Sequence, residues 1–201
     1  MSFSSSKYWD DRYKNNGNSG TGSYGQLAEY KADIINKFVS DKKINSIIEF
    51  GCGDGNQLSL LKVPLYTGYD VSFSIIEKLK KVYSDSAHKK FYHMSDYDKN
   101  LKADLTLSLD VLYHLIENNV YKEYMQKLFD ASDKYVIIYS CHRNDIVKDL
   151  HIKYRTFLSW ILHNKQEWKL INVIENAYPY NRENPSATSW SDFYIFEKVN
   201  E

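Results

Sequence analysis

The stretch SIIEFGCGDGN, at residues 46–56, constrains the fold more than any other part of the chain. A short β-branched and aromatic run, 44–50, is typical of a buried strand, and it ends at Gly51, Gly53 and Gly55. Glycine permits a positive φ and lets the backbone approach a ligand closely, because it has no Cβ. We therefore expect a strand, a tight glycine turn and then a helix whose amide groups point at a ligand.

Strands and helices alternate along most of the chain. Apolar runs predict further strands at 64–70, 90–94, 103–110, 134–140, 168–175 and 191–198. Helical periodicity predicts helices at 26–39, 75–83, 118–131 and 155–163. In the first helix the apolar positions at helical spacing are Leu27, Tyr30, Ile34 and Phe38. Ser74 is the expected cap of the second helix.

This order of elements indicates an α/β fold with a mostly parallel sheet and helices on both faces. The last two strands have only a loop between them, which favours an antiparallel hairpin at one edge of the sheet. Acidic residues lie at or near the ends of three strands, namely Glu49, Asp70 and Asp110. Ligands bind beyond the carboxyl ends of the strands in such sheets, so we expect a binding site there.

Charge and composition argue against several classes of partner. Lys+Arg and Asp+Glu are both 26, and the lysines are interleaved with acids, so no basic stripe for a nucleic acid is expected. No run of 18 apolar residues predicts a membrane span, and the N-terminus lacks the pattern of a secretory signal. The two cysteines, Cys52 and Cys141, suggest neither a disulfide framework nor a zinc site. A cytoplasmic location fits this composition.

The glycine turn differs from a dinucleotide-binding turn in two positions. The pattern GxGxxG would place its third glycine at residue 56, which is Asn56 here. Glu49 stands two residues before the first glycine, where a carboxylate would repel a pyrophosphate and suit a cationic group instead. These two positions argue against a nicotinamide-dependent dehydrogenase.

The motifs at the strand ends resemble those of the class I S-adenosylmethionine-dependent methyltransferases. EFGCGDG matches their first motif, Asp70 in YTGYDVS matches the acid that ends strand two, and ADLTLSLDVLYHL matches the motif that ends strand four. The resemblance covers residues 44–140 and implies a Rossmann-like seven-stranded sheet with S-adenosyl-L-methionine as cofactor. The cofactor-binding residues that we expect on this basis are Trp9, Arg12, Glu49, Gly51, Cys52, Gly53, Gly55, Asn56, Asp70, Val71, Asp96 and Tyr97.

Methyl transfer to a hydroxyl requires the removal of a proton, and His114 is the leading candidate for the base. His114 lies four residues after Asp110, so a helical segment would place both side chains on one face, where the acid would raise the basicity of the imidazole. We expect Asp110 to line the methyl pocket, and we expect no metal ion. A purely structural role for His114 stays open.

Two other regions are expected to close the site. Tyr8, Trp9, Arg12 and Tyr13 precede the glycine-rich stretch 15–25. We expect residues 1–25 to form a cap or lid and residues 26–201 to form the methyltransferase domain, with an amphipathic N-terminal helix docked on the sheet as the alternative. The residues expected to contact the acceptor are Tyr24, His142, Arg143 and Arg155.

The acceptor itself is only weakly indicated. The sequence favours a small molecule over a nucleic acid, and we expect a hydroxyl of a sugar or surface-glycan precursor. The alternatives are an amine of an amino sugar or other metabolite, and a module that binds S-adenosylmethionine without catalysis. We expect a monomer or a homodimer.

Overall fold

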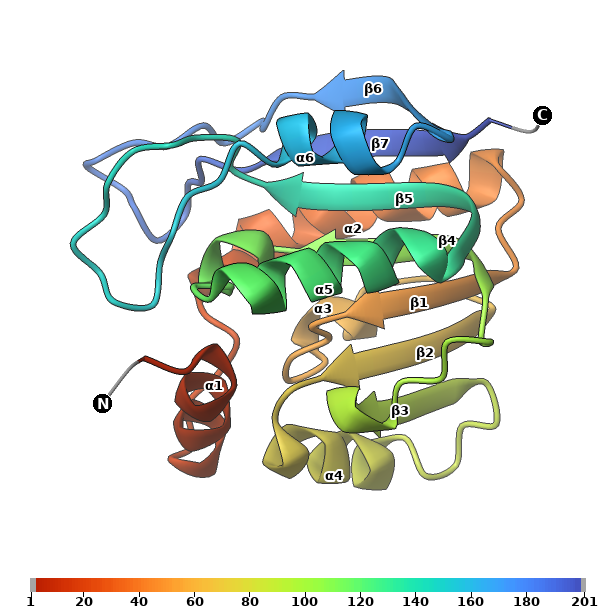
Figure 1. Ribbon diagram of the computed structural model, residues 1–201. Coiled ribbons are helices and arrows are strands. Elements are labelled where there is room, and N and C mark those ends of the chain that lie inside the picture. The colour runs from red at the N-terminus through yellow and green to blue at the C-terminus, as the bar shows by residue number, and fades with distance from the viewer. Residues whose placement is uncertain (1–2, 200–201) are drawn as a thin grey trace.

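A seven-stranded sheet forms the centre of the protein, which is described here by a computed structural model over residues 3–199 (Figure 1). The strand order is β3–β2–β1–β4–β5–β7–β6. Their bounds are β1 Ser46–Phe50, β2 Leu65–Asp70, β3 Lys89–His93, β4 Ala103–Leu109, β5 Ser132–Ser140, β6 Trp168–Ile174 and β7 Asp192–Lys198. β7 runs antiparallel to both β5 and β6, which confirms the predicted hairpin at one edge of an otherwise parallel sheet.

Helices cover both faces of the sheet. In the view of Figure 1, α5 (Asn118–Asp130) and α6 (Phe157–Asn164) lie in front, and α2 (Gly25–Asp41) and the single turn α3 (Asn56–Ser59) lie behind. α4 (Phe73–Val82) connects β2 to β3, and α1 (Ser5–Lys14) precedes the domain core. Short 3₁₀ turns lie at Thr21–Ser23, Met94–Asp96 and Leu112–His114.

Two hydrophobic clusters, one on each face, explain why the central strands are mainly apolar. Neighbouring residues in a strand point to opposite faces, so Ile47 packs with the α2, α3 and α4 side while Ile48 packs with the α5 and α6 side. Both residues are 1% exposed. A parallel sheet that is covered on both sides therefore needs continuous rather than alternating apolar runs.

Several local expectations need correction. The buried stripe of α2 is Leu27, Ala28, Lys31, Ala32, Ile35 and Val39. Tyr30, Ile34 and Phe38 lie at its partly buried flank. The cap of α4 is Ser72 rather than Ser74, because the Ser72 hydroxyl accepts a hydrogen bond from the Ile75 amide at 3.3 Å.

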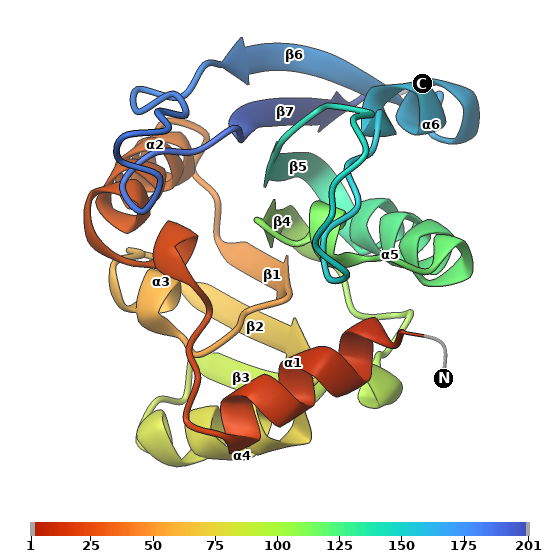
Figure 2. The same ribbon diagram turned by 90° about the vertical axis from the view of Figure 1, so that its left-hand side faces the viewer.

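The carboxyl ends of β1, β2 and β4 lie side by side, and α1 passes across this edge of the sheet (Figure 2). α1 packs against α4, which places the N-terminal segment over the edge where the sequence predicts a site. Within residues 3–199, no helix is both long and apolar enough to cross a membrane.

Candidate active site

A cavity of about 220 Å³ lies at the carboxyl ends of β1, β2 and β4. Its walls come from α1, the glycine turn, the residues that follow β2 and β4, and α5. The sequence-predicted residues that line it are Trp9, Glu49, Gly51, Cys52, Gly53, Asp70, Val71, Asp110 and His114. The fold therefore brings residues from positions 9 to 114 of the chain into one cavity.

The glycine turn presents bare backbone to this cavity. Gly51 has a φ of +82° and Gly53 a φ of +55°, which are conformations that other residues rarely adopt. A Cβ at Gly51 would lie 2.5 Å from Cγ2 of Val111, and a Cβ at Gly53 would overlap the Ser19 hydroxyl. Both positions thus require glycine for their backbone conformation and for the space around them.

Asp70 connects the end of β2 to the glycine turn. Its Oδ2 accepts a hydrogen bond from the Gly53 amide at 2.9 Å, and its Oδ1 accepts one from the Ser72 amide at 3.0 Å. Burial raises the pKa of Asp70, while these backbone amides act in the opposite direction. The carboxyl group is therefore fixed beside the turn and lines the cavity.

Glu49 is a buried carboxyl group in the same wall and is 2% exposed. Its Oε2 accepts a hydrogen bond from the Tyr66 hydroxyl at 2.5 Å. Burial raises the pKa of Glu49 to about 7, although the Tyr66 hydroxyl and the charge of Lys31 favour the ionised form. A cationic ligand nearby would favour ionisation further.

Asp110 adopts a φ of +59°, so it does not start a helical turn toward His114 as the sequence suggested. Its carboxylate is held by three side chains from separate parts of the fold. Oδ2 accepts from Lys31 Nζ at 2.7 Å, and Oδ1 accepts from the Tyr113 hydroxyl at 2.9 Å and the Ser191 hydroxyl at 3.1 Å. Positive φ at a non-glycine residue persists where the surrounding structure fixes it, and here these three donors do so.

His114 lies in the 3₁₀ turn and makes a hydrogen bond through Nδ1 to the main-chain oxygen of His151, at 2.9 Å. A carbonyl oxygen only accepts, so Nδ1 carries the proton. Burial lowers the pKa of His114 to about 4 and outweighs the effect of Asp110, so the expected increase in basicity does not occur. At neutral pH the imidazole is uncharged, and its Nε2 is an acceptor.

The N-terminal segment covers the cavity and is anchored at the start and near the middle of α1. The amide and hydroxyl of Ser5 donate to the Glu117 carboxylate at 2.9 and 2.5 Å. Near the middle of the helix, Asp10 Oδ1 accepts from the Ser72 hydroxyl at 2.7 Å. Trp9 lies between these anchors, with its ring edge-on to His114 at 4.9 Å. α1 is thus a docked helix that also forms one wall of the cavity.

Five residues expected at the cofactor or the acceptor lie outside the cavity lining and form the support of the glycine turn or of neighbouring loops. Arg12 donates from Nε to the Asn18 main-chain oxygen at 2.6 Å. Tyr24 donates to Asp54, the Asn56 side chain donates to the Ser23 oxygen, and Gly55 caps α3. Asp96 is exposed and accepts from the Ser95 hydroxyl.

Tyr97 and the three remaining residues expected at the acceptor also lie outside the lining. Tyr97 packs on Phe50 and Tyr69. The Arg155 guanidinium donates to the Leu115 main-chain oxygen at 2.6 Å and to the Ile116 oxygen at 3.1 Å. The His142 ring packs edge-on against Phe157.

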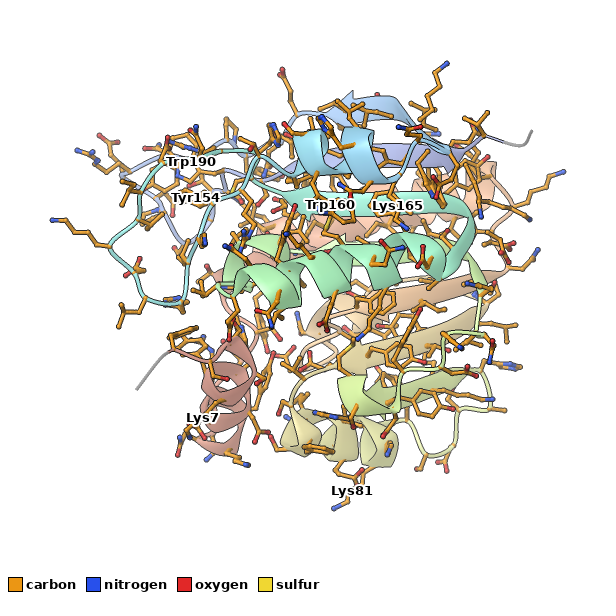
Figure 3. All side chains as sticks on the ribbon, viewed as in Figure 1. Lys7, Lys81, Tyr154, Trp160, Lys165 and Trp190 are labelled. Carbon is orange, nitrogen blue, oxygen red and sulfur yellow. The ribbon has the colours of Figure 1, made fainter. Side chains whose placement is uncertain are left out.

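Arg143 joins the two loops that follow β5 and β6. Its guanidinium lies 4.1 Å from the Trp190 ring and 5.7 Å from the Tyr154 ring, and both aromatic residues are labelled on these loops in Figure 3. The Asp145 carboxylate pairs with the same guanidinium. Arg143 therefore connects the rim loops and does not reach the cavity wall.

Sequence reasoning missed several lining residues, of which Lys31 is the most informative. Lys31 is 0% exposed and lies among the apolar residues of α2. Its position between Ala28 and Ala32, with Leu27 and Ile35 one turn away on either side, was the available signal. Met94, Leu115 and Tyr124 also line the cavity. As apolar or aromatic residues of a strand-rich chain, they carry no signal that separates them from the core.

Among residues 3–199, no three His, Cys, Asp or Glu side chains lie in an arrangement that could hold a metal ion.

The sheet order, the glycine turn and the acids at the carboxyl ends of β1, β2 and β4 define the class I methyltransferase architecture. The sequence matches the family model described as "Methyltransferase domain" over residues 24–175, and the chain belongs to this family. A search of the curated proteins found no match.

Solved structures with the same fold include three from bacteria. The methyltransferase domain of bacterial CtHen1-C is 18% identical, with a TM-score of 0.67, and 87% of this chain and 100% of that chain are covered. The N-methyltransferase NodS from Bradyrhizobium japonicum WM9, in complex with S-adenosyl-L-homocysteine, is 13% identical, with a TM-score of 0.65 and coverage of 87% and 88%. Magnesium protoporphyrin IX methyltransferase from Synechocystis PCC 6803, with bound S-adenosylmethionine, is 15% identical, with a TM-score of 0.67 and coverage of 99% of both chains.

S-adenosyl-L-methionine is the cofactor of this family, and the cavity fits it chemically. Glu49 and Asp70 provide carboxyl groups for a cationic nucleoside with ribose hydroxyls. Gly51 and Gly53 line the cavity with backbone that carries no Cβ, so a ligand can approach it closely. Apolar side chains at Met94 and Leu115 provide a surface for a planar base.

Proposed function

We propose that the protein transfers a methyl group from S-adenosylmethionine to a hydroxyl of a small-molecule acceptor, a sugar or a surface-glycan precursor. The observation that carries this proposal is the state of His114. Its Nδ1 is committed to a main-chain oxygen, and the ring lines the cavity in its neutral form. An uncharged imidazole with a free Nε2 can accept the proton that a hydroxyl loses.

The residues proposed to bind the cofactor are those that the fold gathers at the strand ends. We expect Asp70, which is fixed beside the glycine turn, to accept hydrogen bonds from ribose hydroxyls, and Glu49 to pair with a positive charge. When bound, the cofactor supplies an activated methyl group on a sulfonium. The protein then has to hold the acceptor oxygen in line with that group, which contributes up to about 7–11 kcal/mol in ideal cases.

The cover over the cavity supports a small acceptor. α1 closes one side of the cavity, with Trp9 in the wall. An aromatic ring in a binding wall suits the apolar face of a sugar ring. Cys52 and Cys141 are both free and buried, which supports the proposed cytoplasmic location. The monomeric or dimeric state stays a prediction.

The test replaces His114 by a residue that keeps the hydrogen bond to His151 but has no basic nitrogen. In H114N the side-chain amide can donate to the same main-chain oxygen. We expect transfer to hydroxyl acceptors, measured as S-adenosylhomocysteine formation over a panel of sugars and amino sugars, to fall by about 10²- to 10⁴-fold. The affinity for S-adenosylhomocysteine should change little, because Asp70 and the glycine turn are intact.

His163 provides the matched control. Its Nδ1 also bonds to a main-chain oxygen, that of Ser159, but the residue is exposed on α6. H163N should retain full activity. Unchanged turnover in H114N would overturn the role of His114 as base, and turnover of amines alone would replace O-methylation by N-methylation.

A further inference from the structure

Three aromatic rings from separate parts of the chain lie nearly parallel to one another beside the cavity. Tyr8 belongs to α1, His151 to the segment that follows β5, and His114 to the 3₁₀ turn after β4. The His151 ring stacks on the Tyr8 ring, with 4.8 Å between centroids and 15° between planes, and on the His114 ring at 5.6 Å and 10°. The stack therefore connects the helix that covers the cavity to the proposed base.

The segment 151–155 lies along the turn that carries His114. In Figure 2 the chain after β5 descends toward the N-terminal half of α1. The Lys153 amide donates to the Tyr113 oxygen at 2.8 Å, and the Arg155 guanidinium donates to two main-chain oxygens just after His114. These bonds hold the middle and the end of the segment, whereas His151 lies at its beginning.

The chain before His151 gives this residue little support. None of the residues 144–150 is buried, and Ile146 and Leu150 are 100% and 79% exposed. The position of the His151 main-chain oxygen therefore depends on the contacts of its own ring with Tyr8 and His114.

This main-chain oxygen determines which nitrogen of His114 carries the proton. It accepts the hydrogen bond from Nδ1 at 2.9 Å and so leaves Nε2 as the acceptor. If the oxygen moved away, the preference for this tautomer would be lost, and a fraction of the rings would carry the proton on Nε2. A ring in that state cannot accept a proton there from a hydroxyl.

We propose that Tyr8 and His151 are positioning residues that set the acceptor state of His114 only while α1 is docked over the cavity. With α1 in place, Tyr8 holds the His151 ring, the His151 oxygen holds the Nδ1 proton, and Nε2 stays free. When α1 moves away for the exchange of cofactor and product, the stack opens and the tautomer is no longer fixed. This inference rests on the proposed role of His114, and it adds two residues that act through that side chain.

α1 is suited to this role because adjacent residues of the helix contact the two histidines. Trp9 lies edge-on to His114 at 4.9 Å, next to Tyr8 on His151. Ser5 is the one buried residue of the helix, so its release exposes little apolar surface. A single movement of α1 would thus remove a ring from each histidine.

The surroundings of His114 agree with a neutral ring in the docked state. Burial has the largest effect and lowers its pKa, as do the charges of His151 and Arg12, while the hydrogen bond to His151 and the charge of Asp110 raise it. α1 contributes to the burial through Trp9. Loss of the docked arrangement should therefore bring the pKa from about 4 toward the ordinary value of 6.5.

The test reads the tautomer directly, from ¹H–¹⁵N correlation spectra of the imidazole nitrogens in the S-adenosylhomocysteine complex. The chain has six histidines, and the H114N spectrum identifies the His114 signals by their absence. In the wild type, Nδ1 should be protonated and Nε2 unprotonated at neutral pH. In Y8A, and in H151A, which keeps the main-chain oxygen but loses the ring, we expect a mixture of both tautomers and a raised pKa.

Two variants serve as controls. Y8F keeps the ring that stacks on His151, so its tautomer and its pKa should match those of the wild type. Y180A removes a tyrosine that is stacked on Trp190 at 4.5 Å on another loop, and it should leave both properties of His114 unchanged. If Y8A does not give a folded protein, H151A supplies the same measurement.

Turnover separates positioning from binding. Y8A and H151A should lower kcat by less than the loss of about 10²- to 10⁴-fold expected for H114N, because a fraction of the rings keeps the active tautomer. The affinity for S-adenosylhomocysteine should stay near that of the wild type, since Ser5 and Asp10 still hold α1. D10A, which removes one of these anchors, should also give mixed tautomers, and its effect should be smaller when Y8A is already present.

A ring protonated on Nδ1 alone in both Y8A and H151A would overturn the coupling. A wild-type ring protonated on Nε2, or fully additive effects of Y8A and D10A on the tautomer, would also overturn it. The spectra require no acceptor, so they judge the coupling by themselves. Full turnover by H114N would instead overturn the proposed function.

Discussion

At the scale of single residues, Glu49 shows how burial and charge oppose each other. Burial raises its pKa to about 7, so the carboxyl group is partly protonated near neutral pH. A cation in the cavity interacts favourably with the ionised form only. Cofactor binding at this wall should therefore depend on pH in a range where most carboxyl groups do not titrate.

The affinity for S-adenosylhomocysteine should rise from pH 5.5 to about 7 and level off above it. Below a pKa of about 7, Glu49 carries a proton that must leave before the carboxylate can pair with the ligand ammonium. Calorimetry across this range measures the effect, and E49Q should bind more weakly at pH 8 with a flat profile. E197Q is the matched control, because Glu197 also accepts from a tyrosine hydroxyl, that of Tyr135, at a distance of 2.9 Å. A pH profile shared by E49Q and the wild type would contradict the prediction.

Sequence reasoning located the residues that lie within a local motif and missed those placed by tertiary packing. Glu49, Gly51 and Gly53 lie at or just beyond the end of β1, so their shared position depends only on that strand. The positions of the Arg12 and Lys31 side chains could be predicted only with knowledge of which way each helix faces. A lysine in an apolar stripe is the signal that could have indicated Lys31.

At the scale of elements, α1 depends on the polar contacts of Ser5 and Asp10 more than on burial. Ser5 is its one buried residue. Burial raises the pKa of Asp10, but hydrogen bonds from Lys14, Ser72 and Ser74 outweigh it and lower the pKa to about 2. Because this pKa is below the ordinary aspartate value of 3.8, the stabilisation by Asp10 is complete above pH 3.8 and is lost as the pH falls toward 2.

D10A should therefore loosen α1 at neutral pH. We expect a loss of about 1 kcal/mol in the free energy of unfolding, since the group is near the surface. Trypsin should cleave faster at Arg12 and Lys14, and S-adenosylhomocysteine should bind more weakly because Trp9 and Tyr13 line the cavity. D11A is the control, since Asp11 pairs with Lys7 on the exposed side. If D10A and D11A gave equal cleavage rates, the anchor at Asp10 would be without effect.

The strands and helices could be predicted wherever the local pattern of residues is enough to determine them. The strands and the longer helices follow from apolar runs and helical periodicity, with boundaries that differ by a few residues. The segment 110–114 was not predictable, because the left-handed conformation of Asp110 depends on three side chains from distant parts of the chain. The sequence of residues 110–114 taken alone favours a helical turn.

At the scale of the whole molecule, the alternation of elements predicted a covered parallel sheet because no other architecture buries so many continuous apolar strands. The resemblance to the family implied a Rossmann-like sheet of seven strands. The cover over the strand ends could not be derived in the same way. It results from hydrogen bonds between segments far apart in the sequence, such as Ser5 with Glu117 and Ser19 with Asp54.

Because the cavity is formed jointly by this cover and the sheet, a ligand in it should stabilise the entire protein. At a concentration 100 times its dissociation constant, S-adenosylhomocysteine should add about 2.7 kcal/mol to the free energy of unfolding. For a chain of this length the midpoint of thermal unfolding should then rise by about 5–10 °C.

Differential scanning fluorimetry measures the shift, with NAD as the comparison ligand and G51V as the control variant. A valine side chain cannot adopt the φ of Gly51 and would collide with Val111, so G51V should show no shift. A larger shift with NAD than with S-adenosylhomocysteine would show that the cavity is built for a dinucleotide.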